Sequence, residues 1–294
     1  SPGSFKHFSA PSNLTRSLDL LRNGSPGHWE KIGRQAVLKL FHYAYDTVPA
    51  YKKLLSDASI DGHKIRTMED FSYVPFTDKT TYLRAHAYED LFPAKDLSGV
   101  TTISATSGST GEPFYFPRGE SQDAQYAYTA EILLKNQLEI DKYSTLGIIG
   151  FALGIWIGGI FTYKNLNKIA SKGYPLALAP VGPDVHIYLP LIKKFGKYFD
   201  QIILMGYPPF IKDIIDNTDR YGVDWKKYRV KILTATEAFS EGFRDYLARR
   251  AFIHNPLTDI VNIYGTVELG TMAYETPLAN LMRKLATDNS KITN

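Results

Sequence analysis

The 294-residue sequence predicts an α/β fold with mixed, mostly parallel sheets covered by helices and a helical lead-in at the N-terminus. Three observations predict this class. Apolar residues recur at helical spacing in the first hundred residues, most clearly over 29–45. From about Val100, extended apolar runs alternate with helical patterns, which is typical of a sheet with helices on both faces. Several of these runs are apolar throughout, as in parallel strands buried on both faces.

The elements follow from these patterns. The lead-in, residues 1–99, is expected to pack on a core formed by residues 100–294, with helices at 29–45, 50–55, 68–71 and 79–86. In the core, strands are predicted at 100–105, 114–117, 146–152, 174–179, 201–205, 230–234 and 259–263. Helices are predicted at 120–138, 156–172, 186–197, 208–219, 239–250 and 278–285. Ser240 favours a helix start, and Arg249 and Arg250 suit the negative end of that helix.

Composition and charge exclude several classes. The 44% hydrophobic and 22% charged content is that of an ordinary globular protein. A net charge of +4 without a dense basic block does not indicate a nucleic-acid partner. The absence of cysteine excludes disulfides, thiolate metal sites and a cysteine nucleophile. The seven histidines form no H-x-x-x-H pair, so a histidine metal site is not expected. No signal sequence opens the chain, so a cytoplasmic location is expected.

The segment 146–163 carries no charged residue over eighteen positions, which reaches the length of a membrane-spanning helix. Five glycines interrupt it, and its flanks lack strong interfacial anchors. We therefore expect no membrane span. The segment is predicted to form a buried strand, a turn at Gly154 and a buried helix from about Trp156.

The segment 104–113 holds five hydroxyl side chains and two glycines directly after a β-branched run. Glycines let backbone N–H groups face a ligand and hydroxyls add donors, so the segment favours a polyphosphate or anion site. It contains no Gly-Lys pair, and a second extended run at 114–116 follows it, so it is not a Walker P-loop. A loop between two strands is expected instead. Composition alone is also compatible with a solvated turn.

A second segment, 263–268, reads Ile-Tyr-Gly-Thr-Val-Glu and follows the predicted strand 259–263. It is expected at the carboxyl ends of the strands, where doubly wound sheets bind ligands. Tyr264 is placed to stack on a planar base, and Glu268 to coordinate a Mg²⁺ ion that carries phosphates. By itself the segment is compatible with an ordinary strand-to-helix turn. Together, the two segments favour nucleotide chemistry.

These segments resemble motifs of the adenylate-forming enzymes, which comprise acyl-CoA synthetases, ligases and adenylation domains. Residues 106–113 match the phosphate-binding form T-S-G-S-T-G-x-P, and 264–268 resembles Y-G-x-[ST]-E. Residues 234–238 resemble the adenine-contacting turn of that family. The layout from Gly147 to 206–208 resembles the phenylacetate-CoA ligase branch, which includes acyl-protein synthetase and capsule-biosynthesis relatives. The resemblance covers roughly residues 35–275.

The resemblance implies that a carboxylate attacks the α-phosphate of ATP, and that coenzyme A or another thiol then takes the acyl group. It implies catalytic roles for Thr106 and Glu268, with Glu268 also holding Mg²⁺. The implied nucleotide-binding residues are Ser107, Gly108, Ser109, Thr110, Gly111, Ala235, Thr236, Glu237, Tyr264, Gly265 and Thr266. The residues expected where the acid enters are Phe151, Trp156, Gly206 and Tyr207, for which plain core packing is an equal alternative.

The chain departs from the family pattern at three points. Phe114 stands where many members have lysine, although the phenylacetate branch commonly lacks it too. Val267 stands at the hydroxyl position before the motif glutamate, where Thr266 would have to substitute by a shift in register. The ribose-binding aspartate and the catalytic lysine of the family's small C-terminal domain find no match before Asn294. The chain is therefore expected to be the large N-terminal domain, without full turnover.

The predicted function is ATP-dependent activation of an organic carboxylic acid for transfer to a thiol. The expected partners are a small carboxylic acid and the missing C-terminal domain in cis. Two alternatives stay open. One is activation of a fatty acid for transfer to a protein thiol, and the other is a non-catalytic module that binds a nucleotide or an acyl group.

Overall fold

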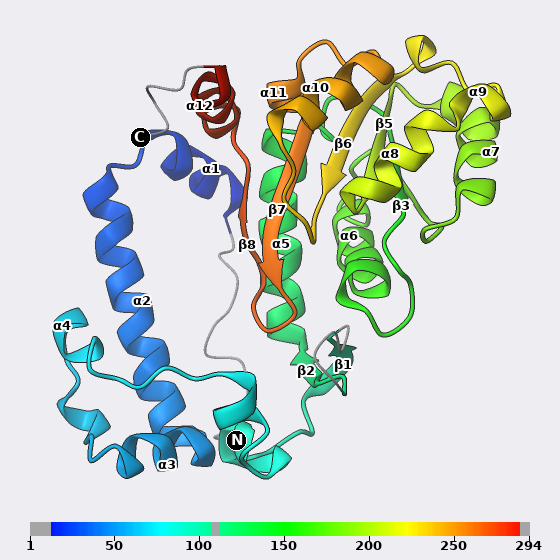
Figure 1. Ribbon diagram of the computed structural model, residues 1–294. Coiled ribbons are helices and arrows are strands. Elements are labelled where there is room, and N and C mark those ends of the chain that lie inside the picture. Colours follow the sequence, from blue (N-terminus) through cyan, green and yellow to red (C-terminus); the bar gives the residue numbers. More distant parts are fainter. Residues whose placement is uncertain (1–12, 107–111, 289–294) are drawn as a thin grey trace. The chain divides into compact units, whose positions relative to one another are not determined.

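The computed structural model describes residues 13–106 and 112–288, and the chain divides into two compact units (Figure 1). The first unit contains the residues up to Thr101 together with 119–121, and the second contains 102–118 and the residues from Gln122 onward. All the sequence-predicted site residues belong to the second unit.

The first unit is mainly helical, as predicted. Its helices are α1 (Leu14–Asn23), α2 (Pro26–Thr47), α3 (Pro49–Asp57) and α4 (Met68–Phe71). A π-helical turn at Lys79–Leu83 replaces the predicted helix 79–86, and α1 has no counterpart among the predictions. Phe41, Tyr45, Leu55 and Ile65 form the core of this unit. Side chains of Asn13 and Ser25 cap α1 and α2, which fixes where these two helices begin.

The second unit is built on a six-stranded sheet with the strand order β4-β3-β5-β6-β7-β8. The strands are β3 (Thr145–Ile149), β4 (Leu176–Pro180), β5 (Gln201–Gly206), β6 (Arg229–Thr234), β7 (Ile260–Thr266) and β8 (Gly270–Tyr274). All neighbours pair in parallel except β7 and β8, which are antiparallel. A separate pair is formed by β1 (Val100–Ala105) and β2 (Tyr115–Gly119). The prediction of a mixed, mostly parallel α/β fold is confirmed.

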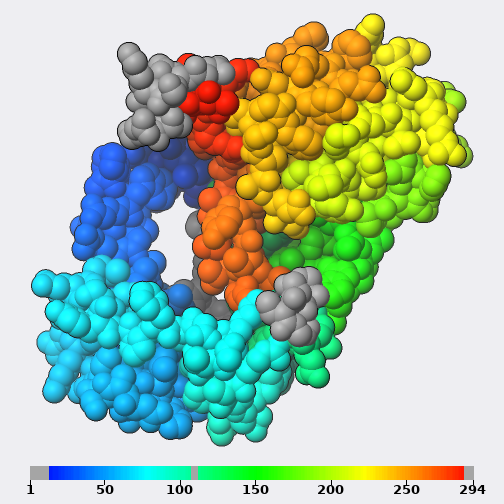
Figure 2. Space-filling view, in the orientation of Figure 1, coloured from blue at the N-terminus to red at the C-terminus, as the bar shows by residue number. Residues whose placement is uncertain are grey.

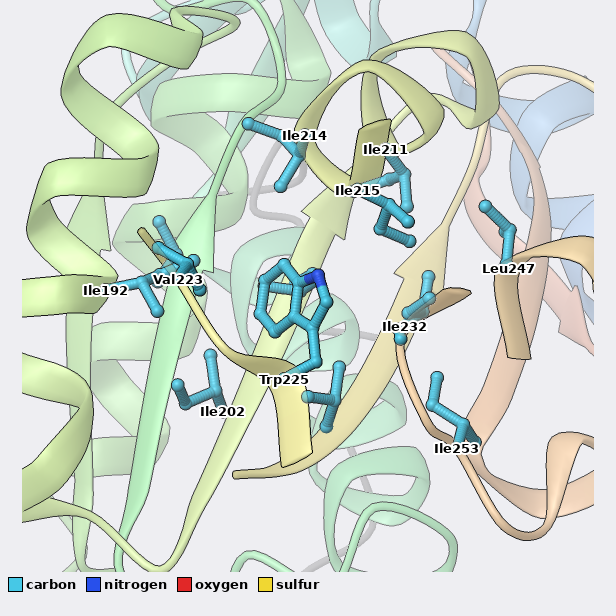
Figure 3. Packing of buried hydrophobic residues seen from close by; sticks show 14 of the residues in the cluster. Ile192, Ile202, Ile211, Ile214, Ile215, Val223, Trp225, Ile232, Leu247 and Ile253 are labelled. Atoms are coloured by element: carbon cyan, nitrogen blue, oxygen red, sulfur yellow. The ribbon is translucent and has the colours of Figure 1, made fainter. Parts of the chain in front are cut away.

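Helices cover both faces of this sheet. They are α5 (Glu120–Asn136), α6 (Thr162–Ala170), α7 (Val185–Phe195), α8 (Pro208–Asp216), α9 (Thr218–Tyr221), α10 (Glu241–Arg250), α11 (Pro256–Asp259) and α12 (Pro277–Asp288). Alternate residues of β5 face opposite sides of the sheet. Ile202 and Leu204 pack with α7, α8 and α10 around Trp225 (Figure 3), whereas Ile203 and Met205 pack with α5 and α6. Ser240 accepts a hydrogen bond from Phe243 N and begins α10, as predicted.

The segment 146–163 differs from its prediction in detail. The strand ends at Ile149, and a π-helical turn at Ile157–Phe161 precedes α6, so the predicted helix 156–172 is wrong at its start. A side chain at Gly159 would place Cβ only 2.1 Å from the Ala152 carbonyl oxygen. The close approach of two backbone segments therefore requires glycine here. Within the described residues, no helix is both long and apolar enough to cross a membrane.

Candidate functional site

The hydroxyl-rich loop connects the paired strands β1 and β2, as the sequence predicts. At its mouth, Thr106 N donates to Phe114 O at 3.0 Å, and Phe114 N donates to Thr106 Oγ1 at 3.0 Å. Thr106 thus uses both its backbone and its hydroxyl to close the loop. The predicted phosphate-binding residues Ser107, Gly108, Ser109, Thr110 and Gly111 lie outside the described residues.

The predicted adenine-contacting turn follows the carboxyl end of β6. Thr236 has φ 80°, which is uncommon for a residue branched at Cβ and costs about 1–3 kcal/mol. Asn262 holds this turn, because its Nδ2 donates to Glu237 O at 3.0 Å and its Oδ1 accepts from Thr234 Oγ1 at 2.9 Å. Ala235 follows directly on β6. Backbone strain of this kind is concentrated at ligand-binding sites, and here it lies at a motif residue.

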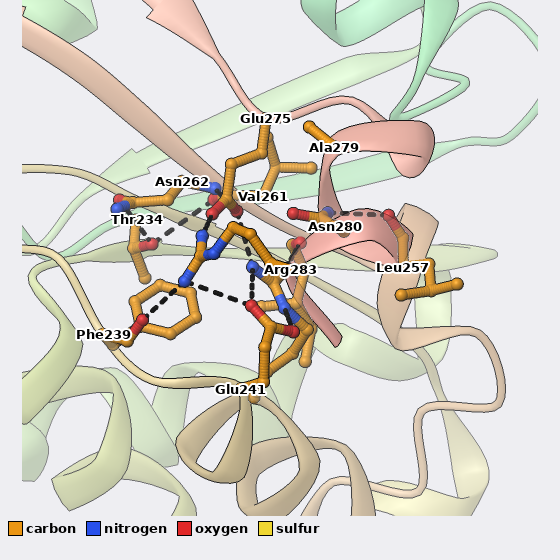
Figure 4. A network of polar contacts seen from close by, with 12 residues as sticks. Thr234, Phe239, Glu241, Leu257, Val261, Asn262, Glu275, Ala279, Asn280 and Arg283 are labelled. Carbon is orange, nitrogen blue, oxygen red and sulfur yellow. Dashed lines mark hydrogen bonds and ion pairs between the residues drawn. The ribbon is translucent and has the colours of Figure 1, made fainter. Parts of the chain in front are cut away.

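Asn262 belongs to a wider polar network, drawn in Figure 4. Glu275 accepts from Asn262 N at 2.9 Å and from Arg244 Nη2 at 2.8 Å. Arg283 on α12 contacts Glu275 and donates to Phe239 O at 2.7 Å. Helices α10 and α12 thereby brace the strand that carries the second motif.

That second motif lies in a hairpin rather than at a strand-to-helix turn, which corrects the expected context. Strand β7 runs on to Thr266, three residues past its predicted end, because β8 pairs with it. Gly265 allows the two strands to approach, since a Cβ there would lie 2.5 Å from the Gly270 carbonyl oxygen. In Figure 2 this hairpin (orange) reaches the surface, and Tyr264 is 64% exposed.

The tip of the hairpin contains Thr266 and Val267, where the sequence departs from the family's motif. Thr266 Oγ1 accepts from Leu269 N at 3.2 Å, so its hydroxyl caps the turn in this structure. Val267 offers only backbone groups, and its carbonyl accepts from Arg118 Nη2. Glu268 is half-buried and lies close enough to Arg118 for their charges to interact.

A cavity of about 290 Å³ lies between α5, the π-helical turn and the ends of β6 and β7. Its apolar walls include Leu133, Leu134, Leu166, Leu233 and Ile263. Among the described residues that line it, none is charged, and its polar groups are hydroxyls and backbone. Five sequence-predicted site residues meet in this wall, namely Phe151, Ala235, Thr236, Gly265 and Thr266.

The other residues predicted for the acid do not line this cavity. Trp156 forms a parallel bridge with Ala105 at the end of β1. Gly206 ends β5, where a Cβ would lie 3.1 Å from Phe210, and the Tyr207 ring packs on Phe210 at 5.8 Å. Of the four predicted residues, Phe151 alone is part of the cavity wall in the described structure.

Sequence reasoning missed a charged cluster beside the hairpin tip, which we call the hairpin anchor (Arg118, Asp123 and Lys164) and in which the first two residues are buried. Arg118 is 5% exposed and Asp123 is fully buried. Lys164 Nζ pairs with Asp123 Oδ2 at 2.5 Å. Lys164 is the first charge after the long uncharged run, and Arg118 interrupts an extended run. In the sequence, these two features alone indicate the cluster. Neither of them identifies the residue with which the charged side chain interacts.

No group of three or more metal-ligating side chains is found in the described parts of the chain. Glu268 therefore stands as a single carboxylate. Mg²⁺ commonly binds through one or two carboxylates together with substrate phosphates and water. The residues present fit a Mg²⁺ ion that arrives with a nucleotide rather than a resident metal.

Comparisons with known proteins find similar proteins by sequence and by fold. No family model matches the chain. Phenylacetate-coenzyme A ligase of Aromatoleum evansii is 23% identical over 228 residues, which cover 77% of this chain and 48% of that protein. Its Thermus thermophilus counterpart is 41% identical over 75 residues, covering 26% of this chain and 16% of that one. The chain spans about half the length of the Aromatoleum protein.

Among solved structures, an open conformation of 2-hydroxyisobutyryl-CoA ligase in complex with 2-HIB-AMP and CoA has a TM-score of 0.69 at 14% identity. The match covers 87% of this chain and 58% of that one. The chain thus has an α/β fold similar to that of this ligase. In sequence, the chain is similar to phenylacetate-coenzyme A ligases.

Proposed function

We propose that this chain binds ATP and a small carboxylic acid and joins them into an acyl-adenylate, the first step of an acid–thiol ligase. One observation carries the proposal. Residues predicted from three separate segments, among them Phe151, Thr236 and Gly265, line one cavity, whose wall also includes the residue directly before the predicted metal carboxylate Glu268. Curated relatives named phenylacetate-coenzyme A ligase support the same class of reaction.

In this step a carboxylate oxygen donates an electron pair to the α-phosphorus. The bond from that phosphorus to the bridging oxygen breaks, and pyrophosphate leaves with the electron pair. Bound Mg²⁺ would offset charge on the phosphates, and Glu268 is the residue that would hold it. The chain's own contribution is positioning, since catalysis of such a transfer depends on orientation and charge stabilisation. Tyr264 and Thr236 border the nucleotide in this proposal.

The cavity supports a small, apolar acid. About 290 Å³ lies at the lower end of the range for small-molecule sites, and the described residues that line the cavity include no cation for a second charged group. We therefore favour a short or aromatic acid over a long-chain fatty acid, which is the alternative substrate. Coenzyme A is the proposed acceptor, because the structurally similar 2-hydroxyisobutyryl-CoA ligase is described with an acyl-AMP and CoA. A carrier-protein thiol is the alternative acceptor.

The test is ATP–pyrophosphate exchange with phenylacetate, benzoate, butyrate and hexadecanoate, on the complete gene product and on this chain beside it. We expect exchange with one or more of the small acids and none with hexadecanoate. Exchange with hexadecanoate alone would favour fatty-acid activation. Binding of ATP without exchange for any acid would favour the non-catalytic module. Failure to bind Mg·ATP would exclude both enzymatic functions, the activation of a small acid and the activation of a fatty acid.

A further inference from the structure

The hairpin anchor joins three segments that are far apart in the sequence. Arg118 on β2 donates to the Val267 carbonyl, 149 residues away at the tip of the β7–β8 hairpin. Its guanidinium carbon lies 4.9 Å from the centre of the Phe161 ring in the π-helical turn. Lys164 on α6 donates to Thr102 Oγ1 on β1 at 2.6 Å. Each of the two strands that carry the phosphate loop is therefore held by a cation, buried Arg118 on β2 and the partly exposed Lys164 that binds β1.

Asp123 connects the two cations. Its carboxylate is fully buried and pairs with Lys164 at 2.5 Å. Burial lowers the pKa of the Arg118 guanidinium, and the nearby Asp123 and Glu268 carboxylates oppose that shift. Arg118 thus lies between an internal carboxylate and the carboxylate predicted to hold the metal.

Arg118 differs from the other buried arginine, Arg244. Arg244 is 1% exposed and binds two carboxylates, with Glu241 at 2.9 Å and Glu275 at 2.8 Å. Its partners hold α10 to the body of the sheet. Arg118 instead bonds a backbone carbonyl directly before Glu268. A planar guanidinium with several donors in fixed directions suits this kind of orientation.

We propose that Arg118 is a positioning residue that fixes the turn 267–269 against β2. The Glu268 carboxylate is thereby held in place for a cation that arrives with a nucleotide. The bond uses the carbonyl of Val267, so it is available although this residue lacks the family's hydroxyl. This inference rests on the proposed function, since it assigns a role within the same nucleotide site.

The test measures equilibrium binding of ATP with Mg²⁺ and with EDTA to the 294-residue chain. Wild type is compared with Arg118→Met, Arg118→Lys and Glu268→Gln. A hydrogen bond to a charged group is lost in Arg118→Met, so we expect about tenfold weaker binding with Mg²⁺ and little change in EDTA. Arg118→Lys should retain part of the Mg²⁺-dependent affinity. Because Arg118 acts through Glu268, the double variant Arg118→Met/Glu268→Gln should bind no more weakly than Glu268→Gln alone.

Arg229→Met is the matched control, since this arginine pairs with Glu139 near the amino ends of the strands and should leave both affinities unchanged. Equal losses in Mg²⁺ and EDTA, or a gain with Mg²⁺, would overturn the positioning role. If Arg118→Met does not fold, Arg118→Lys and Asp123→Asn carry the same comparison. Wild type that fails to bind Mg·ATP would instead contradict the proposed function itself, so the two failures are distinguishable.

Discussion

The two ends of the strands in the six-stranded sheet are held together in different ways. We call them the amino edge and the carboxyl edge, after the ends of the parallel strands that lie there. At the amino edge, Lys231 on β6 is 1% exposed and lies 3.1 Å from carboxylate oxygens of both Glu139 and Asp259. At the carboxyl edge, the cavity wall has no charged member among the described residues and includes the strained Thr236. The amino edge also has the larger cavity, about 890 Å³, lined by those same ion pairs.

This difference teaches that cavity size and charge do not by themselves mark a ligand site. The charged groups at the amino edge form ion pairs with one another, and these pairs hold the strands and the preceding loops together. The carboxyl edge has a strained backbone, the exposed side chain of Tyr264 and a cavity. These features are expected where a bound ligand supplies further contacts.

The largest expected effect comes from breaking the amino edge. Lys231→Met leaves Glu139 and Asp259 without their buried cation and should lower the free energy of unfolding by about 3–5 kcal/mol. Urea denaturation measures it. Lys142→Met is the control, because Lys142 pairs with the same Glu139 from an exposed position and should change little. Equal effects of the two substitutions would contradict a distinct role for the buried pair.

A smaller effect at the same edge depends on pH. Burial alone would raise the pKa of Glu139, but hydrogen bonds from Lys142 and Lys231 outweigh it and lower the pKa to about 2. The ionised group therefore stabilises the fold above pH 4.5, its ordinary value, and this contribution is lost as the pH falls toward 2. Relative to Glu139→Gln, wild type should be more stable at pH 7, with the difference shrinking below pH 4.5. A difference independent of pH would exclude this linkage.

At the carboxyl edge, filling the cavity should change which acid is used. Ala130 lies in the cavity wall on α5, so Ala130→Phe should reduce exchange with phenylacetate by about 10–200-fold and spare butyrate. The ratio of the two exchange rates is the measurement. Thermal unfolding checks that the variant is folded. An unchanged ratio would show that the acid binds elsewhere.

The smallest effect concerns strain. Glycine adopts the positive φ of Thr236 without a Cβ clash, so Thr236→Gly should stabilise the unit by about 1 kcal/mol while weakening ATP binding. Thr236→Ala keeps a Cβ and should gain little stability. Chemical denaturation with parallel ATP titration tests both effects. A similar gain from alanine would mean that the backbone is not strained there.

Much of the fold could be predicted because the pattern was strong. The runs predicted at 201–205 and 230–234 correspond to β5 (Gln201–Gly206) and β6 (Arg229–Thr234) within one residue at each end. The start of α6 was missed because the π-helical turn depends on a close backbone contact at Gly159. Strand β8 was missed because a short, half-exposed edge strand has little apolar signal.

The site divides in the same way. Thr236 and Gly265 were named from local motifs and Phe151 from the layout of the chain, and these three residues line one cavity, while their roles stay predictions. The hairpin anchor was not found, because a bond between Arg118 and the carbonyl of Val267 has no trace in either local sequence. Their separation of 149 positions is bridged only by the folded sheet.

The π-helical turn before α6 gives the anchor an unusual sensitivity to chain length. A helix advances by about 100° per residue, so if the start of Ile157–Phe161 stays in place, deleting one residue there would turn the side chains at the start of α6 by as much as that angle. Lys164 would then face away from Asp123, even though every side chain of the anchor was unchanged. In this turn, an insertion or a deletion would change the geometry of the site more than a substitution would.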